Sequence, residues 1–272
     1  AISFVVSTVF LLRIRKVETL PERTEGEPKP RMWPEVKEGI NWIVRNPYLR
    51  RIAATTGLSN LFSSMGFAIF VLYALRVLHL HPWEIGLVFA AGSVGAIIGT
   101  LVVNRIQRTL GVGRTIIAMA MLYSPAFILV PFAPRSFPLP VLIIAFFVTQ
   151  FGGVGYNISQ ISLRQAITPE RLQGRMNAAM RWIVWGTIPI GTLAGGALAT
   201  AFTLRTTLFA GAFLGAPTFL FVLFSPLRSM HDMPEPITHP TQAQAEMDGG
   251  LIEPAPMITE PGPPAPADTR LP

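Results

Sequence analysis

Six stretches of this sequence contain no Lys, Arg, Asp or Glu over a length that can cross a lipid bilayer. Each has at least about 20 residues, which is the length that an α-helix needs to span the hydrocarbon core. An α-helix satisfies its own backbone hydrogen bonds in lipid, whereas irregular backbone does not. We therefore predict an all-α membrane protein with six complete spans, at about residues 52–75, 85–104, 115–134, 139–163, 180–203 and 206–226.

The composition agrees with a membrane protein and argues against several other classes. Charged residues make up 14% of the 272 residues, whereas soluble domains contain about a quarter. The formal charge of +7 does not indicate a nucleic-acid partner, because the Lys and Arg residues lie between apolar runs. The sequence has no cysteine and no motif for catalysis or metal binding. We expect no enzyme activity, no catalytic residues, no metal and no cofactor.

The distribution of basic residues predicts how the spans are oriented. Residues 13–51 contain ten Lys or Arg, residues 105–114 contain three, and residues 164–181 contain four. If the spans alternate in direction, these segments share one side, and the opposite loops contain only three. Basic residues near span ends stay in the cytoplasm. We expect a multi-pass protein of the plasma membrane, the bacterial inner membrane, with a cytoplasmic connector and C-terminus.

The segments outside the six spans carry separate predictions. Residues 1–12 are apolar but too short to span, which we interpret as the end of a truncated transmembrane helix. Residues 13–51 form a cytoplasmic connector with an amphipathic helix near 34–46, which suits either a membrane surface or another soluble domain. Residues 229–272 are rich in proline and poor in large apolar residues, which predicts a disordered cytoplasmic tail.

Small residues recur at the spacing that lets transmembrane helices approach closely. Gly95 and Gly99 lie four residues apart in the second span, and Gly191 and Gly195 repeat this spacing in the fifth. These are the middle spans if the six form two inverted triplets. We favour packing within one bundle over a dimer contact. Pro189 lies in the same run of small residues and would allow the fifth span to bend.

Amide side chains within the spans are the candidate substrate contacts, because no ionisable side chain lies deep in any of them. Gln150, Asn157 and Gln160 fall on one narrow stripe of the fourth span. Asn60 belongs to a weaker polar face of the first span. An amide stripe faces either a water-filled pathway or a neighbouring helix, and the sequence leaves both interpretations open.

Two segments resemble the major facilitator superfamily of transporters. The segment from Asn104 and Arg105 to Arg114 resembles the second copy of its Gly-x-Leu-x-x-Asp-Arg-x-Gly-Arg signature, with Asn104 nearest the position of the acid. Residues 169–178, with the sequence PERLQGRMNA, resemble a loop of the enterobactin-exporter and macrolide-efflux branch. The arrangement of a basic connector followed by six spans is similar to the C-terminal half of such a transporter.

This resemblance implies a secondary transporter that exports a small amphiphilic compound by alternating access. Its partners would be the lipid bilayer, the small-molecule substrate and a missing N-terminal half of six helices. The alternative is a membrane anchor or assembly protein with a cytoplasmic docking tail. In a transporter, the polar residues at the cytoplasmic mouth are either topology markers or parts of a gate, and the gate candidates are Asn104, Arg105, Arg114, Arg164, Glu170, Gly174, Arg175 and Arg181.

Overall fold

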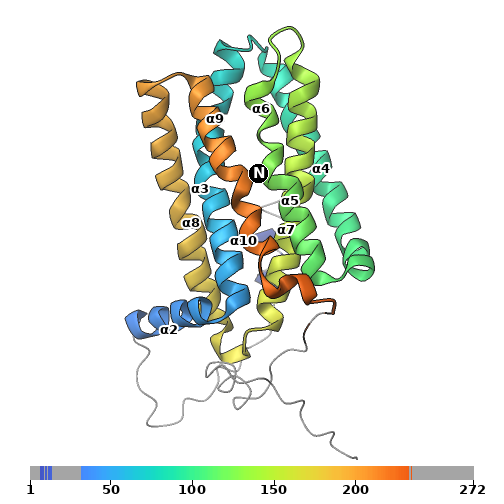
Figure 1. Ribbon diagram of the computed structural model, residues 1–272, viewed down its shortest axis with the longest axis vertical. Helices are drawn as coiled ribbons and strands as arrows, with labels where there is room; N and C mark the ends of the chain where they lie inside the picture. The colour runs from blue at the N-terminus through green and yellow to red at the C-terminus, as the bar shows by residue number, and fades with distance from the viewer. Residues whose placement is uncertain (1–6, 9, 11, 14–31, 233, 235–272) are drawn as a thin grey trace, which may run out of the picture. The chain divides into compact units, whose positions relative to one another are not determined.

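A computed structural model describes residues 7, 8, 10, 12, 13, 32–232 and 234 (Figure 1). The chain divides into two units, Ala1–Met32 and Trp33–Pro272. In the first unit the described residues are helical. Most of the predicted truncated helix at 1–12, much of the connector and nearly all of the predicted disordered tail at 229–272 lie outside the described residues.

The second unit consists of helices, and its described residues form no strand. Six of its helical segments are long and apolar enough to cross a membrane, which confirms the predicted fold class. The described helices of this unit are α2 (Met32–Arg45), α3 (Pro47–Arg76), α4 (Pro82–Leu110), α5 (Val112–Ala126), α6 (Leu129–Phe132), α7 (Pro138–Ala166), α8 (Glu170–Ala201), α9 (Leu204–Gly215), η1 (Ala216–Phe219), α10 (Leu220–Leu223) and η2 (Pro226–Ser229).

The helices continue beyond the predicted spans at the end of the bundle where α2 lies. Arg105 belongs to α4 and Arg114 to α5, and only Gly111 separates these two helices. Arg164 lies in α7, while Arg175 belongs to α8. The basic loops expected from the sequence are therefore largely helical. Long charged side chains reach water from a helix end, so the first charge does not mark the end of the helix.

The middle helix of the first triplet, α4, packs closely along α7 (Figure 1). A Cβ atom at Gly95 would overlap the carbonyl oxygen of Phe147, and one at Gly99 would lie 2.7 Å from the carbonyl oxygen of Phe151. The two contacts are one helical turn apart on each helix. Only glycine allows the two backbones to approach so closely.

The middle helix of the second triplet, α8, packs along α3 in the same way. Cβ atoms at Gly191 and Gly195 would overlap the carbonyl oxygens of Leu61 and Met65. The third helix of each triplet follows the same pattern. α5 packs against α7, the first helix of the second triplet, and α9 packs against α3, the first helix of the first triplet. The helices thus form two triplets, α3–α4–α5 and α7–α8–α9, in which each middle helix contacts the first helix of the other triplet.

Pro125, Pro189 and Pro217 have different effects on the spans that contain them. Pro189 lies inside α8, which continues as one helix from Glu170 to Ala201. In contrast, α5 ends one residue after Pro125, and the last span changes to a 3-10 helix around Pro217. The predicted bend at Pro189 therefore does not interrupt the helix, and the two breaks are in the outer helices α5 and α9.

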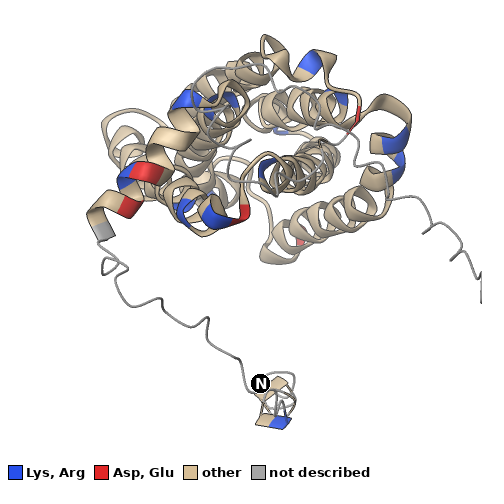
Figure 2. Cartoon of the chain, turned by 90° about the horizontal axis from the view of Figure 1, so that it is seen from below, with Lys and Arg blue, Asp and Glu red and all other residues tan. Residues whose placement is uncertain are grey.

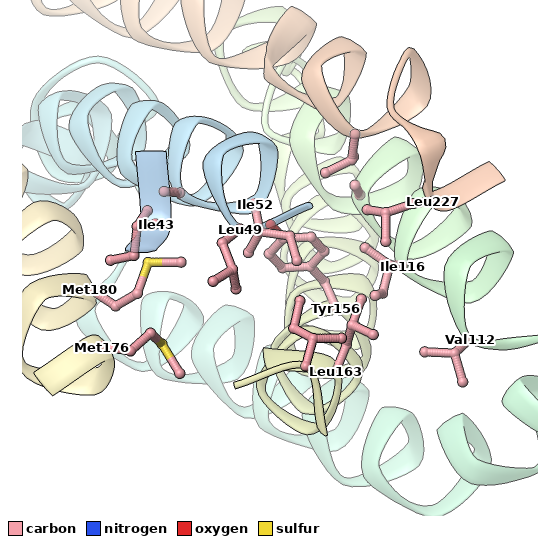
Figure 3. Close-up of a cluster of buried hydrophobic side chains, with 14 of the residues drawn as sticks. Ile43, Leu49, Ile52, Val112, Ile116, Tyr156, Leu163, Met176, Met180 and Leu227 are labelled. Atoms are coloured by element: carbon pink, nitrogen blue, oxygen red, sulfur yellow. The ribbon is translucent and has the colours of Figure 1, made fainter. Parts of the chain in front are cut away.

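Helix α2 is part of the core of the second unit. Trp42 and Ile43 are buried, and they share a cluster of buried side chains with Met176 and Met180 of α8. Figure 3 shows Ile43 pointing toward Met180 within this cluster. Asn46 alone separates α2 from α3, and its side-chain oxygen accepts hydrogen bonds from the first backbone N–H groups of α3. The connector helix is therefore packed against the bundle by its buried face and joined to α3 at its C-terminal end.

The segment after the last span packs across the start of α5. The backbone N–H of Val112 donates to the carbonyl oxygen of His231 over 3.0 Å, and that of Gly113 donates to Met230 over 3.2 Å. A Cβ at Gly113 would overlap the carbonyl oxygen of Leu227. These contacts satisfy two of the N–H groups that a helix leaves free at its first turn.

We predict that Gly195→Ala lowers the free energy of unfolding in detergent by about 1–3 kcal/mol, because the added methyl group overlaps the backbone of α3. Gly196→Ala is the matched control, since nothing lies within 4 Å of a Cβ at that position. The two variants are compared by denaturant titration of the purified protein. Equal stability of the two variants would show that the α3–α8 contact tolerates a side chain.

Candidate functional site

A cavity of about 650 Å³ lies between helices of both triplets. Its walls come mainly from α3, α4, α7 and α8, and α5 contributes one tyrosine. No Lys, Arg, Asp, Glu or His is among the described residues that line it, which are Thr56, Ser59, Asn60, Ser63, Ser64, Phe67, Phe89, Gly92, Ser93, Tyr123, Phe127, Phe146, Thr149, Gln150, Gly153, Val154, Tyr156, Asn157, Val184 and Trp185. The cavity is therefore aromatic and polar but uncharged.

Three phenylalanines from three helices form one wall of the cavity. Phe89 of α4 meets Phe146 of α7 edge to face, with ring centroids 5.6 Å apart, and Phe67 of α3 lies 6.0 Å from Phe89. Tilted and edge-to-face pairs are the favoured geometries for aromatic rings. This wall offers apolar ring surfaces, whereas the opposing polar residues offer hydrogen bonds.

Gln150 is a predicted pathway residue that lies in the cavity wall. It is exposed in the cavity and makes no hydrogen bond with any residue that the structure describes. The hydroxyl oxygen of the adjacent Thr149, also in the cavity wall, is buried without a partner among the described residues. An unpaired amide beside an aromatic wall can bind a polar group of a small molecule.

The other predicted amides divide between the cavity and the helix contacts. Asn60 lines the cavity and donates to the carbonyl oxygen of Val184, which ties α3 to α8. Asn157 lines the cavity and accepts from the amide of Gln160 over 3.0 Å. Gln160 is only 2% exposed and does not line the cavity. The structure therefore places Gln160 outside the cavity, with its hydrogen-bond partners Asn157 and Arg164 on its own helix.

Arg164 continues this line of amides toward the end of α7. Its guanidinium donates to Gln160 over 3.2 Å and to Asn177 of α8 over 3.1 Å. The Nε atom of Arg164 is buried and has no hydrogen-bond partner in the part of the chain that the structure describes. None of the carboxylates in the described part of the chain pairs with Arg164. A half-buried cation thus lies two helical turns beyond Asn157, the last α7 residue of the cavity lining, with amides as its hydrogen-bond partners.

Two other predicted gate residues already have partners within this chain. Arg175 forms ion pairs with Glu35 and Glu38 of α2, although 137 residues separate Arg175 from Glu38. Arg181 lies over the ring of Trp185, 4.7 Å from its centroid. The sequence analysis missed Glu35 and Glu38, although two acids three residues apart mark one face of an amphipathic helix.

The remaining gate candidates lie on the surface. Arg105, Arg114 and Glu170 are exposed and form no ion pair within the described residues. Asn104 is exposed and borders a second, shallower hollow beside His231. Gly174 is exposed, with open space beside it. The structure therefore does not bring these residues to the main cavity.

A series of hydrogen-bonded hydroxyl groups, the hydroxyl chain, links the cavity wall to the last span. Tyr123 donates to Ser59 over 3.0 Å, Ser59 bonds Thr218 over 2.7 Å, and Thr218 donates to the carbonyl oxygen of Gly215. This hydroxyl chain connects α3, α5 and the 3-10 helix η1. Sequence analysis missed it because Ser and Thr commonly bond their own helix in a membrane.

Comparison with known proteins adds the family. Residues 1–263 match the family model described as Major Facilitator Superfamily. The chain belongs to the major facilitator superfamily. A curated relative is the multidrug efflux pump Tap of Mycolicibacterium fortuitum, which is 26% identical over 180 residues. The match covers 64% of this chain and 42% of Tap, so the chain spans less than half the length of this superfamily relative.

We predict that Ser59→Ala lowers the free energy of unfolding by about 1–3 kcal/mol, because it removes the partner of the Tyr123 hydroxyl and one of the partners of the buried Thr218 hydroxyl. Ser63→Ala, one turn away in the same cavity wall, removes only a bond to its own helix and should cost about 0.5 kcal/mol or less. Unfolding of both variants in detergent measures the difference. A larger loss for Ser63→Ala would contradict the role given to the hydroxyl chain.

Proposed function

We propose that this chain is half of a secondary transporter that exports small amphiphilic molecules by alternating access. The cavity carries the proposal, because it lies between two inverted triplets and presents the unpaired amide of Gln150 beside an aromatic wall. Membership of the superfamily and similarity to a multidrug efflux pump support export. A second half of six helices would complete the pathway, and the enterobactin-exporter and macrolide-efflux branch is our proposal for its subfamily.

The cavity lining suggests the chemistry of the substrate. Ring surfaces of Phe67, Phe89 and Phe146 suit an apolar or aromatic part, and the amide of Gln150 suits a hydrogen-bonding part. Charged groups are absent from the described lining, so this half selects by shape and hydrogen bonds. If proton binding drives transport, the titrating carboxylate belongs to the other half.

Arg164 is the gate residue that we propose in place of the longer set predicted from the sequence. Arg175 is neutralised by α2 and Arg181 lies against Trp185, whereas Arg164 has only amide partners in the described chain. A charge at the membrane boundary is stabilised by an opposite charge. A carboxylate of the other half would supply it when the cytoplasmic mouth closes.

The orientation of the protein remains part of the proposal. We place the α2 end of the bundle in the cytoplasm and the protein in the inner membrane of a bacterium, on the basis of the biased distribution of Lys and Arg. The competing function is a membrane anchor or assembly protein. The coding sequence upstream of Ala1 separates the two, because six further spans support a transporter and an unrelated domain supports an anchor.

We expect Gln150→Ala to reduce the rate of substrate export by the complete transporter by on the order of tenfold, since one hydrogen bond to a ligand contributes about 1 kcal/mol or more. Gln165→Ala is the matched control, because Gln165 is exposed at the end of the same helix and outside the cavity. Export of a panel of amphiphilic dyes from loaded cells measures the effect. Equal rates for the two variants would remove Gln150 from the pathway.

We expect Arg164→Gln to shift the access equilibrium toward the inward-open state by about 5–150-fold, because the outward-open state loses a charge pair across its closed mouth. The readout is labelling of a cysteine introduced at Ser93 in the cavity by an impermeant maleimide added outside. Arg135→Gln removes an equally positive but exposed residue and serves as control. Unchanged labelling in Arg164→Gln, with topology preserved, would refute the gate.

A further inference from the structure

Helix α2 presents one face to the bundle and another away from it. It lies across the end of the bundle, beside the first turns of α8 (Figure 1). Its backbone contacts α8 directly, because a Cβ at Gly39 would lie 2.5 Å from the carbonyl oxygen of Arg175. Trp42 and Ile43, on the same face as Gly39, are buried against the bundle. This face of α2 is therefore buried against the bundle of the same chain.

The acidic residues of α2 form ion pairs with arginines of α8. Glu38 pairs with both Arg171 and Arg175, and Glu35 pairs with Arg175 over 3.5 Å. In the view of Figure 2 from below, α2 carries both acidic and basic residues. The acids are neutralised by the bundle, so the basic residues of α2 dominate the charge of its outer surface.

The outer face of α2 combines exposed apolar and basic side chains. Trp33, Ile40 and Val44 are 83%, 40% and 50% exposed, and their spacing of seven and four residues aligns them along one stripe. Lys37 and Arg45 are exposed and form no ion pair within the described residues. Lys37 lies within one turn of Ile40, and Arg45 follows Val44.

The position of α2 along α8 places this face at the level of the membrane boundary. The contact of Gly39 with Arg175 is only two turns before Trp182 of α8. Trp182 is strongly exposed at the start of the apolar part of that helix. Exposed tryptophans mark the boundary between hydrocarbon and headgroups. The outer stripe of α2 therefore lies next to the lipid headgroups.

We propose that the outer face of α2 binds anionic phospholipid. Trp33, Ile40 and Val44 would enter the boundary between headgroups and acyl chains, and Lys37 and Arg45 would contact the phosphates. An interfacial helix binds through its buried apolar area together with attraction of its basic residues to anionic lipid. Because Arg175 and Glu38 join α2 to α8, a lipid held by α2 would restrain the helix that carries Trp185 into the cavity. This binding does not depend on the proposed transport activity.

The test uses a single cysteine, because this chain has none of its own. In the complete protein, Ile40→Cys is labelled with bimane and the protein is reconstituted into phosphatidylcholine vesicles with spin-labelled phosphatidylglycerol or spin-labelled phosphatidylcholine. We expect both lipids to quench the label and phosphatidylglycerol to quench it at lower mole fraction. The mole fraction of phosphatidylglycerol that gives the same quenching should be lower by about fivefold for each of the two charges. This factor corresponds to ~1 kcal/mol per basic residue beside an anionic leaflet.

Two double variants test whether the difference in quenching between the two lipids comes from the basic residues of α2. Lys37→Gln with Arg45→Gln should bring phosphatidylglycerol and phosphatidylcholine to nearly equal quenching. Arg76→Gln with Arg135→Gln removes the same charge from exposed positions outside α2 and should preserve the difference. Absence of quenching by either lipid would show that the face lies in water or against a protein, and equal quenching by both lipids in the unaltered helix would show apolar insertion alone. Either result overturns the proposal.

Discussion

Direct contact between helix backbones is the interaction on which this bundle depends. Lipid chains are as apolar as the side chains they surround, so burial of apolar area does not hold membrane helices together as it holds a soluble core. Glycines at four-residue spacing instead allow van der Waals contact over a full turn of α4 on α7 and of α8 on α3. The same closeness shapes the cavity, because Gly92 lies against the side chain of Gln150 one turn before Gly95.

These two contacts also determine what each helix can present to the cavity. α7 meets α4 along one side and α5 along another, which leaves the stripe of Gln150 and Asn157 facing inward. α3 is held similarly by α8 and α9, so that Asn60 and the hydroxyl groups beside it face the same space. A polar cavity is therefore built from helices whose other sides are apolar, and it needs no charged residue within the described lining.

The spans were predictable because charge and hydropathy are local properties, and the equivalent glycine pairs were visible as a repeated spacing. The cavity was predictable only in part. Gln150, Asn157 and Gln160 occupy one stripe, but depth within the bundle decides that Gln150 meets the cavity while Gln160 is covered by its neighbours. Pairing of Arg175 with α2 joins residues far apart in sequence, and no local pattern of charges identifies such partners.

The segment that follows the last span has a practical consequence for anyone who extends or shortens this polypeptide. By hydropathy the bundle ends near Arg228, yet the carbonyl oxygens of Met230 and His231 accept from the first N–H groups of α5. A reporter protein or affinity handle fused directly at Arg228 would put foreign residues into the segment that packs against Val112 and Gly113. The junction for such a fusion therefore belongs after Asp232, beyond the last of these contacts.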